Sequence, residues 1–172
     1  MNTKILYIYN IIRLFLPETS LFSLKNKILR LAGAKIGNNV RICSSVKILG
    51  DGDLEIGDNV WIGISTLIVS SKSRQNPNTK ITIGSNIDIA PRVYIGTGTH
   101  VIDINSENIA GEGISYDITI ENGCWICAES TLLPGVRIGS KTIVAAKTLV
   151  NKDLLENSVY AGIPAKFIKY VK

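Results

Sequence analysis

The sequence predicts an all-β solenoid, in which short strands stack coil upon coil behind a short helical arm. An aliphatic residue returns at every sixth position through most of the 172 residues, and glycine often follows it. Aromatic residues make up only 6% of the chain although 45% of it is hydrophobic, so branched aliphatic side chains must fill the core. Such side chains pack well on the faces of β-strands.

The repeat begins at Ile36 and runs, with interruptions, to Val150. A short strand with one inward aliphatic side chain, closed by a tight turn of Gly, Asn or Asp, explains its period. A unit of this size cannot bury its core alone and has to stack on its neighbours. We therefore assign residues 35–157 to the repeat body. The fifteen aliphatic positions are Ile36, Ile42, Ile48, Ile56, Ile62, Ile68, Ile83, Ile89, Ile95, Ile120, Ile126, Leu132, Ile138, Val144 and Val150.

Two long insertions interrupt the repeat. The first holds a polar run over residues 70–80, and the second holds a predicted protruding loop over residues 101–118. Gly111 and Gly113 are the expected hinges of the second insertion. Loops of this length inside a solenoid are usually functional, and a tolerated insertion is the alternative.

Residues 1–34 predict a helical arm. Residues 4–16 are strongly apolar, but they fall short of the roughly 20 that an ordinary transmembrane helix needs. Residues 21–32 repeat apolar side chains at helical spacing, with Ser20 as the expected N-cap and Gly33 as the expected end. Two interpretations stay open: helices docked on the body or on a neighbouring subunit, and a basic amphipathic anchor on a membrane surface.

The net charge of +5 is concentrated near the end of the chain, where six lysines follow residue 140. Anionic lipids and phosphorylated small molecules are therefore candidate partners. Arginine-rich tracts with interleaved aromatic residues do not occur in the sequence, so we expect no nucleic acid as a partner.

The three cysteines, Cys43, Cys124 and Cys127, form an odd set without a convincing signal peptide, which is typical of a reducing compartment. Cys124 and Cys127 have the spacing of a redox pair. No thioredoxin-like pattern surrounds them, so we interpret both as packing residues. We expect a cytoplasmic protein, and the arm leaves open a peripheral place at the inner face of the membrane.

His100 is the only histidine, and it stands at the root of the second insertion. A lone histidine is more often structural, but a loop root at the edge of a solenoid is exposed and shaped. Imidazole, with an unperturbed pKa of about 6.5, suits proton transfer at neutral pH. We therefore predict that His100 acts as a general base.

The segment that ends at His100 resembles the catalytic segment of the maltose, galactoside and nodulation-type O-acetyltransferases. The arm is similar to the leaders of capsule, colanic-acid and O-antigen acetyltransferases, and the resemblance covers roughly residues 16–170. It implies a left-handed parallel β-helix of about five coils, with three hexads in each coil. The segments that carry it are residues 89–100 (IAPRVYIGTGTH), 118–127 (ITIENGCWIC), 132–139 (LLPGVRIG) and 160–166 (YAGIPAK), the last in a closing segment over residues 158–172.

The resemblance implies an acetyl-CoA-dependent O-acetyltransferase that acts on a sugar of a surface polysaccharide, such as a capsule or O-antigen. Transfer would be direct, with His100 as the general base and backbone amides as donors to the oxyanion. Asp103 is a candidate to orient the imidazole, and a backbone carbonyl is the alternative. The family also implies a homotrimer with active sites between subunits, and no metal is expected.

The resemblance also implies, position by position, which residues bind the acetyl donor and the acceptor. The pantetheine of CoA is expected to pass Ala128 and Ala146. Lys166 and Lys169 are expected at the phosphates of CoA. The expected donor residues are Ala128, Ala146, Asn151, Lys152, Lys166 and Lys169. The expected acceptor residues are Ser65, Ser70, Tyr94 and Tyr116. The sequence departs from the family at Cys127 and Lys147, which both touch the expected CoA groove.

Three alternatives compete with this interpretation. A metal enzyme of the γ-carbonic anhydrase type needs three histidine ligands, which one histidine per chain cannot supply at non-equivalent positions. An N-acetyltransferase of an amino sugar nucleotide would use the same base and stays open. A non-catalytic β-helix scaffold predicts no affinity for CoA and no role for His100, and it also stays open.

Overall fold

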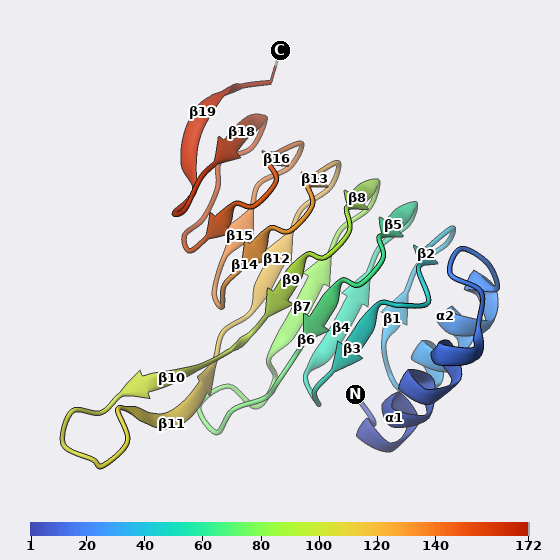
Figure 1. Cartoon of the computed structure of the whole chain (residues 1–172), viewed down its shortest axis with the longest axis horizontal. Coiled ribbons are helices and arrows are strands. Elements are labelled where there is room, and N and C mark those ends of the chain that lie inside the picture. Colours follow the sequence, from blue (N-terminus) through green and yellow to red (C-terminus); the bar gives the residue numbers. More distant parts are fainter. Residues whose placement is uncertain (172) are drawn as a thin grey trace.

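The computed structural model describes residues 1–171 and shows a parallel β-helix (Figure 1). Each coil contributes one short strand to each of three parallel sheets, here called A, B and C, and five coils are complete in the described residues. The fifteen aliphatic positions all point inward, each with at most 8% of its surface exposed. The predicted fold class is therefore confirmed.

The strands of the three sheets follow the coils in order. Sheet A consists of β1 (Lys35–Ile36), β4 (Asp53–Ile56), β7 (Lys80–Ile83), β12 (Ile118–Ile120) and β15 (Arg137–Ile138). Sheet B consists of β2 (Arg41–Ile42), β5 (Val60–Ile62), β8 (Ile87–Ile89), β13 (Trp125–Ile126), β16 (Ile143–Val144), β18 (Ser158–Ala161) and β19 (Lys166–Tyr170). Sheet C consists of β3 (Lys47–Leu49), β6 (Leu67–Val69), β9 (Tyr94–Gly96), β14 (Thr131–Leu132) and β17 (Leu149–Val150).

The register stacks equivalent repeat positions on one another. Ile95 of β9, for example, pairs with Ile68 in the coil before and with Leu132 in the coil after. The core is thus a set of aliphatic ladders that run along the helix axis, and each buried side chain supports its neighbours on both sides.

The corners of the coils use left-handed backbone at residues other than glycine. Arg92 and Glu129 occupy equivalent corners with φ of 59° and 62°. This conformation is unfavourable for residues with a Cβ, so the backbone bonds between coils enforce it. Glu129 N, for instance, donates to Pro91 O in the coil before at 3.0 Å, and Arg92 N donates to Ile64 O at 2.9 Å.

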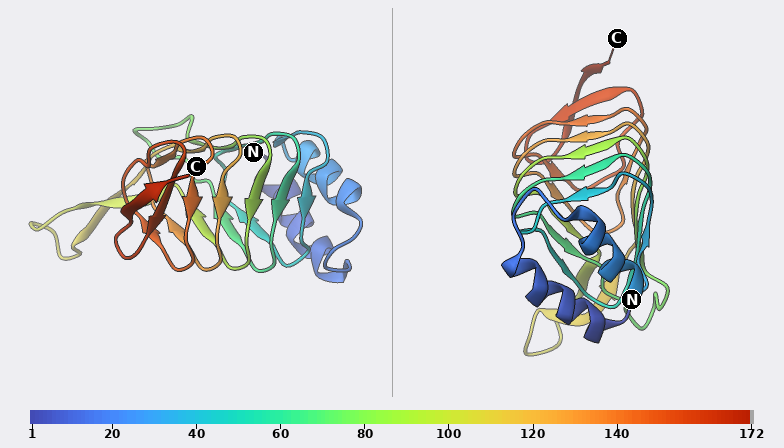
Figure 2. Two further views of the ribbon diagram at one scale, coloured as in Figure 1. Left: turned by 90° about the horizontal axis from the view of Figure 1, so that it is seen from above. Right: turned by 90° about the vertical axis from the view of Figure 1, so that its right-hand side faces the viewer.

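The arm covers the first coil (Figure 2). It comprises α1 (Thr3–Ile12), the 3-10 turn η1 (Arg13–Phe15) and α2 (Phe22–Leu31). Lys25 of α2 is fully buried, and its Nζ donates to Ser44 Oγ at 2.9 Å. The expected cap Ser20 does not cap α2, because Leu21 takes the N-cap position in a left-handed conformation and no side chain caps the helix. Among residues 1–171, no helix combines the length and apolar character needed to cross a bilayer.

The second insertion forms an antiparallel hairpin that projects from the coils (Figures 1 and 2). Its strands are β10 (Gly98–Ile102) and β11 (Ala110–Ser115), so the excursion begins at Gly98. Gly111 and Gly113 were expected to be hinges, but both lie inside the strand β11. The closing segment forms the antiparallel pair β18–β19, and its last residue, Lys172, lies outside the described residues.

Candidate functional site

His100 lies on β10, just beyond the end of β9, at the corner between sheets C and A. We call this edge the C–A corner. His100 pairs with Gly113 across the hairpin, and its side chain is exposed. Opposite residues of an antiparallel pair face the same side. The imidazole of His100 therefore lies beside Gly113, which has no side chain.

The Nδ1 atom of His100 lies 2.9 Å from the carbonyl oxygen of Gly111. A carbonyl only accepts hydrogen bonds, so Nδ1 must carry the proton. In the neutral imidazole, Nε2 then holds the free lone pair, which is the state that a general base requires.

The structure does not place Asp103 on the imidazole. The Asp103 carboxylate accepts from Asn105 N at 3.0 Å, while the Gly111 carbonyl holds the ring within residues 1–171. A Cβ at position 111 would approach Asp103 Cβ to 2.9 Å, so the two residues are in tight contact. Asp103 therefore supports the strand that orients His100 and makes no bond to the ring itself.

A cavity of about 230 Å³ lies in front of His100, where the two insertions meet. A chain of hydroxyls joins them, because Ser115 Oγ lies 2.9 Å from Ser73 Oγ and 2.6 Å from Thr79 Oγ1. The lining residues are Ser71, Lys72, Ser73, Gly98, Thr99, His100, Gly113, Ile114 and Ser115. Sequence reasoning missed Lys72, Ser73 and Ser115, and the polar run 70–80 was the available signal for the first two.

The predicted acceptor residues separate in the structure. Ser70 is fully buried, and its hydroxyl donates to Asp53 O at 3.0 Å, so an acceptor has no access to it. Ser65 lies at the opposite corner, between sheets B and C, here called the B–C corner. Tyr94 lies on the outer face of sheet C with its ring over Gly96, and Tyr116 is half exposed at the base of the hairpin.

The predicted donor residues fall into three places. Ala128 and Ala146 stack at the B–C corner of neighbouring coils, where Lys147 N donates to Ala128 O at 2.9 Å. Asn151 and Lys152 follow β17 and are exposed at the C–A corner, on the side of His100. Lys166 and Lys169 are exposed on β19. One chain therefore holds His100 and the two alanines at opposite ends of the strands of sheet C.

The cysteines are free thiols in the structure. Burial raises the pKa of Cys124 and of Cys127, which keeps both protonated at neutral pH, and Cys124 Sγ donates to Gly139 O at 3.1 Å. Their surroundings are those of packing residues. Within residues 1–171, no group of three or more His, Cys, Asp or Glu side chains is arranged to hold a metal ion.

Comparison with known proteins assigns the family. No protein-family model matches the chain. WcaF of Escherichia coli K12, an acetyltransferase assigned by inference to colanic acid biosynthesis, is 37% identical over 142 residues, which cover 83% of this chain and 72% of the relative. The chain belongs to the hexapeptide-repeat acetyltransferase family. The galactoside O-acetyltransferase of E. coli K12 is 30% identical to this acetyltransferase over 138 residues, which cover 80% of the chain and 64% of the relative.

Solved structures share the fold of this acetyltransferase. A hexapeptide-repeat acetyltransferase of Vibrio cholerae, solved with acetyl-CoA, superposes with a TM-score of 0.66 at 23% identity and covers 99% of this chain and 87% of that one. A galactoside acetyltransferase solved with CoA superposes with a TM-score of 0.69 at 23% identity, over 99% and 79% of the two chains. The left-handed parallel β-helix is thus the fold of this chain.

Proposed function

We propose that the protein is an acetyl-CoA-dependent O-acetyltransferase that acts on a sugar hydroxyl of a surface polysaccharide, with His100 as the general base. The observation that carries the proposal is the bond from His100 Nδ1 to Gly111 O, which leaves Nε2 free beside a polar cavity. The relationship to a galactoside O-acetyltransferase supports oxygen as the acceptor atom, and the relationship to WcaF supports a surface glycan as the target.

The chemistry needs one proton carrier. Nε2 of His100 removes the proton of the acceptor hydroxyl while its oxygen attacks the thioester carbonyl. The tetrahedral intermediate, held by backbone amide donors, then collapses and breaks the C–S bond. The imidazolium returns its proton to the CoA sulfur, so the base is regenerated in each turnover.

The donor is proposed to lie along the B–C corner. Ala128 and Ala146 carry only a methyl group, which leaves room for the pantetheine chain across two coils. Lys166 and Lys169 project into solvent on β19 and would meet the phosphates, where lysine acts as a point charge. Asn151 and Lys152 complete the proposed donor residues on the side of His100.

The separation of these residues supports an active site shared between copies of the chain, as in the proposed homotrimer. His100 lies past the end of β9, whereas Ala128 precedes β14, which pairs with β9 in parallel. The thioester at the B–C corner of one chain would therefore react at His100 of a neighbouring chain. Each active site is then complete only between two copies.

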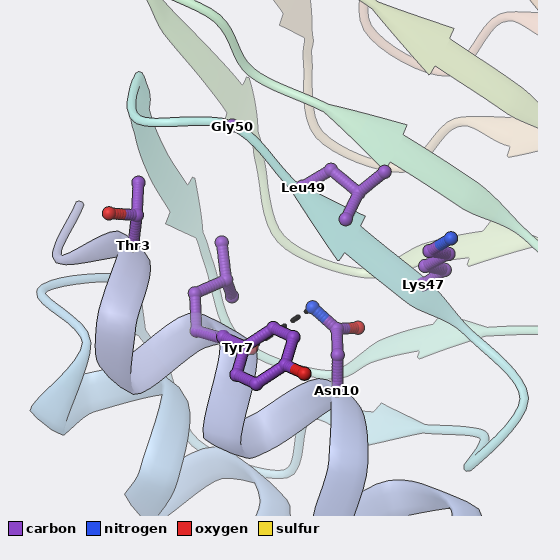
Figure 3. A pocket seen from close by; sticks show the side chains of 7 residues that line it. Thr3, Tyr7, Asn10, Lys47, Leu49 and Gly50 are labelled. Carbon is purple, nitrogen blue, oxygen red and sulfur yellow. Dashed lines mark hydrogen bonds between the residues drawn. The ribbon is translucent and has the colours of Figure 1, made fainter.

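The arm is the proposed contact with the inner face of the membrane. Tyr7, Leu14 and Phe15 expose 68%, 68% and 82% of their surface. Tyr7 also lines a groove of about 330 Å³ between α1 and β3 (Figure 3). Lys47 stands at this groove, where an anionic headgroup is attracted.

The test of the proposed function is His100→Ala, with transfer followed by release of the CoA thiol. Loss of a general base lowers turnover by about 10²–10⁴, while thermal stabilisation by acetyl-CoA should persist. Full turnover in this variant would reject His100 as the base. An N-acetyltransferase would act on an amino sugar and ignore the matching hydroxyl sugar, and a scaffold would show neither CoA binding nor turnover.

A further inference from the structure

We infer that Lys72 binds an anionic group of the acceptor, so that the substrates are acidic sugars or sugar phosphates. The inference rests on the proposed function, because it concerns the cavity in front of His100. The shared chemistry is an anionic oxygen group placed beside the hydroxyl that is acetylated.

Ser73 is held in the cavity wall by both insertions. Thr79 Oγ1 donates to Asn76 O at 2.6 Å, and Ser115 Oγ lies 2.6 Å from Thr79 Oγ1 and 2.9 Å from Ser73 Oγ. Ser73 Oγ also accepts from Asn76 N at 3.1 Å. Ser115 and Thr79 are at most 3% exposed. The loop that carries Lys72 is therefore anchored at the next residue before any acceptor binds.

Lys72 brings a positive charge to the same wall. Its backbone N–H donates to Asp51 Oδ1 at 2.9 Å, which fixes the loop at this residue. Its ammonium forms no ion pair within residues 1–171. The lining of the cavity includes no aspartate or glutamate. The cavity beside His100 is thus lined by a positive charge and by no carboxylate that would neutralise it, which favours an anionic oxygen group.

The remaining walls leave space for a sugar ring. A Cβ built at Gly113 would meet no atom within 4 Å, and one built at Gly98 would lie 4.0 Å from Ser71 Cβ. Bare backbone therefore borders the cavity next to the imidazole. A sugar placed there would present its hydroxyl to Nε2 and its anionic group to Lys72.

The experiment measures kcat/KM with acetyl-CoA for three acceptors: a glucuronic acid oligosaccharide, a sugar 1-phosphate and a neutral glucan oligosaccharide. Wild type should prefer an anionic acceptor. Lys72→Glu should lower kcat/KM for that acceptor by about 10- to 100-fold, the range of a charge-assisted hydrogen bond, and should change the neutral one less than about twofold. Lys72→Arg should retain the preference. Lys80→Glu is the matched control, because Lys80 is exposed on β7 and does not line the cavity.

The two anionic acceptors separate a sugar carboxylate from a phosphate as the source of the charge. Calorimetric binding of the same ligands to wild type, Lys72→Glu and Lys80→Glu tests the inference even without turnover. Weaker binding of an anionic ligand in Lys72→Glu alone supports it. Equal loss for neutral and anionic acceptors, or a loss confined to acetyl-CoA affinity, overturns it. The proposed function fails separately, if transfer does not depend on His100.

Discussion

The imidazole Nδ1 of His100 and the carbonyl oxygen of Gly111 lie 2.9 Å apart, across the two strands of the projecting hairpin. The proposed general base is thus oriented by backbone, and the orientation depends on the position of β11. A register irregularity between His100 and Ile102 brings Gly111 into this place. The hairpin therefore serves as the positioning element of the proposed active site.

Substitution of Gly111 by alanine should impair turnover more than stability. The added Cβ would lie 2.9 Å from Asp103 Cβ and 3.1 Å from Val101 O, so β11 has to move. Misplacement of a catalytic group by about 1 Å costs roughly 100-fold. We expect kcat to fall by about 10- to 100-fold with an unchanged KM for acetyl-CoA. Glu112→Ala, on the same strand with an exposed side chain, should leave kcat within about twofold.

Asp103→Asn should retain turnover within about twofold. The amide keeps an oxygen that can accept from Asn105 N, and the imidazole keeps its bond to Gly111. A carboxylate that orients a base directly is far more sensitive, since the corresponding change in a catalytic triad costs about 10⁴-fold. Steady-state kinetics would decide, and a loss above about 100-fold would assign Asp103 the orienting role.

Two inactive variants should complement each other if the site lies between copies. His100→Ala removes the base, and Ala146→Trp fills the proposed donor groove while leaving His100 in place. Mixed trimers made by co-expression should contain intact sites wherever a wild-type groove faces a wild-type His100. Random mixing of equal amounts predicts about a quarter of wild-type activity. Activity no higher than that of either variant alone would place each site within one chain.

Lys25 should make the stability of the arm depend on pH. Burial lowers the pKa of Lys25 from its ordinary value, so the native state binds fewer protons than the unfolded state between the two pKa values. Stability from this group therefore rises with pH up to the ordinary lysine value of about 10.4. Urea unfolding should show that the free energy of unfolding of wild type rises relative to that of Lys25→Met as the pH is raised toward 10. Lys27→Met, at an exposed position of α2, should show no such trend.

The aliphatic ladder should be sensitive at its centre. Ile95 is fully buried between Ile68 and Leu132. Ile95→Ala should lower the free energy of unfolding by about 2–5 kcal/mol, because the stacked coils cannot close the cavity. Ile104→Ala, near the tip of the hairpin with 79% of its surface exposed, should change it by less than about 0.5 kcal/mol. Denaturant unfolding of both variants measures the contrast.

The sequence by itself determined the β-helix and its coil count, and it singled out the candidate general base. The inward position of Ile36 or Ile95 follows from local periodicity, because a six-residue unit places the same side chain in the core of every coil. His100 was recognisable because it is the only histidine and stands where the period breaks. Nothing in the local pattern, however, distinguishes Asp103 from Gly111 as its orienting partner.

The tertiary structure decided which distant residues meet. The pairing of β10 with β11 selected the Gly111 carbonyl, and the contact of the two insertions brought Lys72 and Ser73 to His100. The same packing buried Ser70 and placed Ala128 at the far end of sheet C from His100. These relationships depend on contacts between residues far apart in the chain, whereas periodicity reports only whether each side chain faces the core or the solvent.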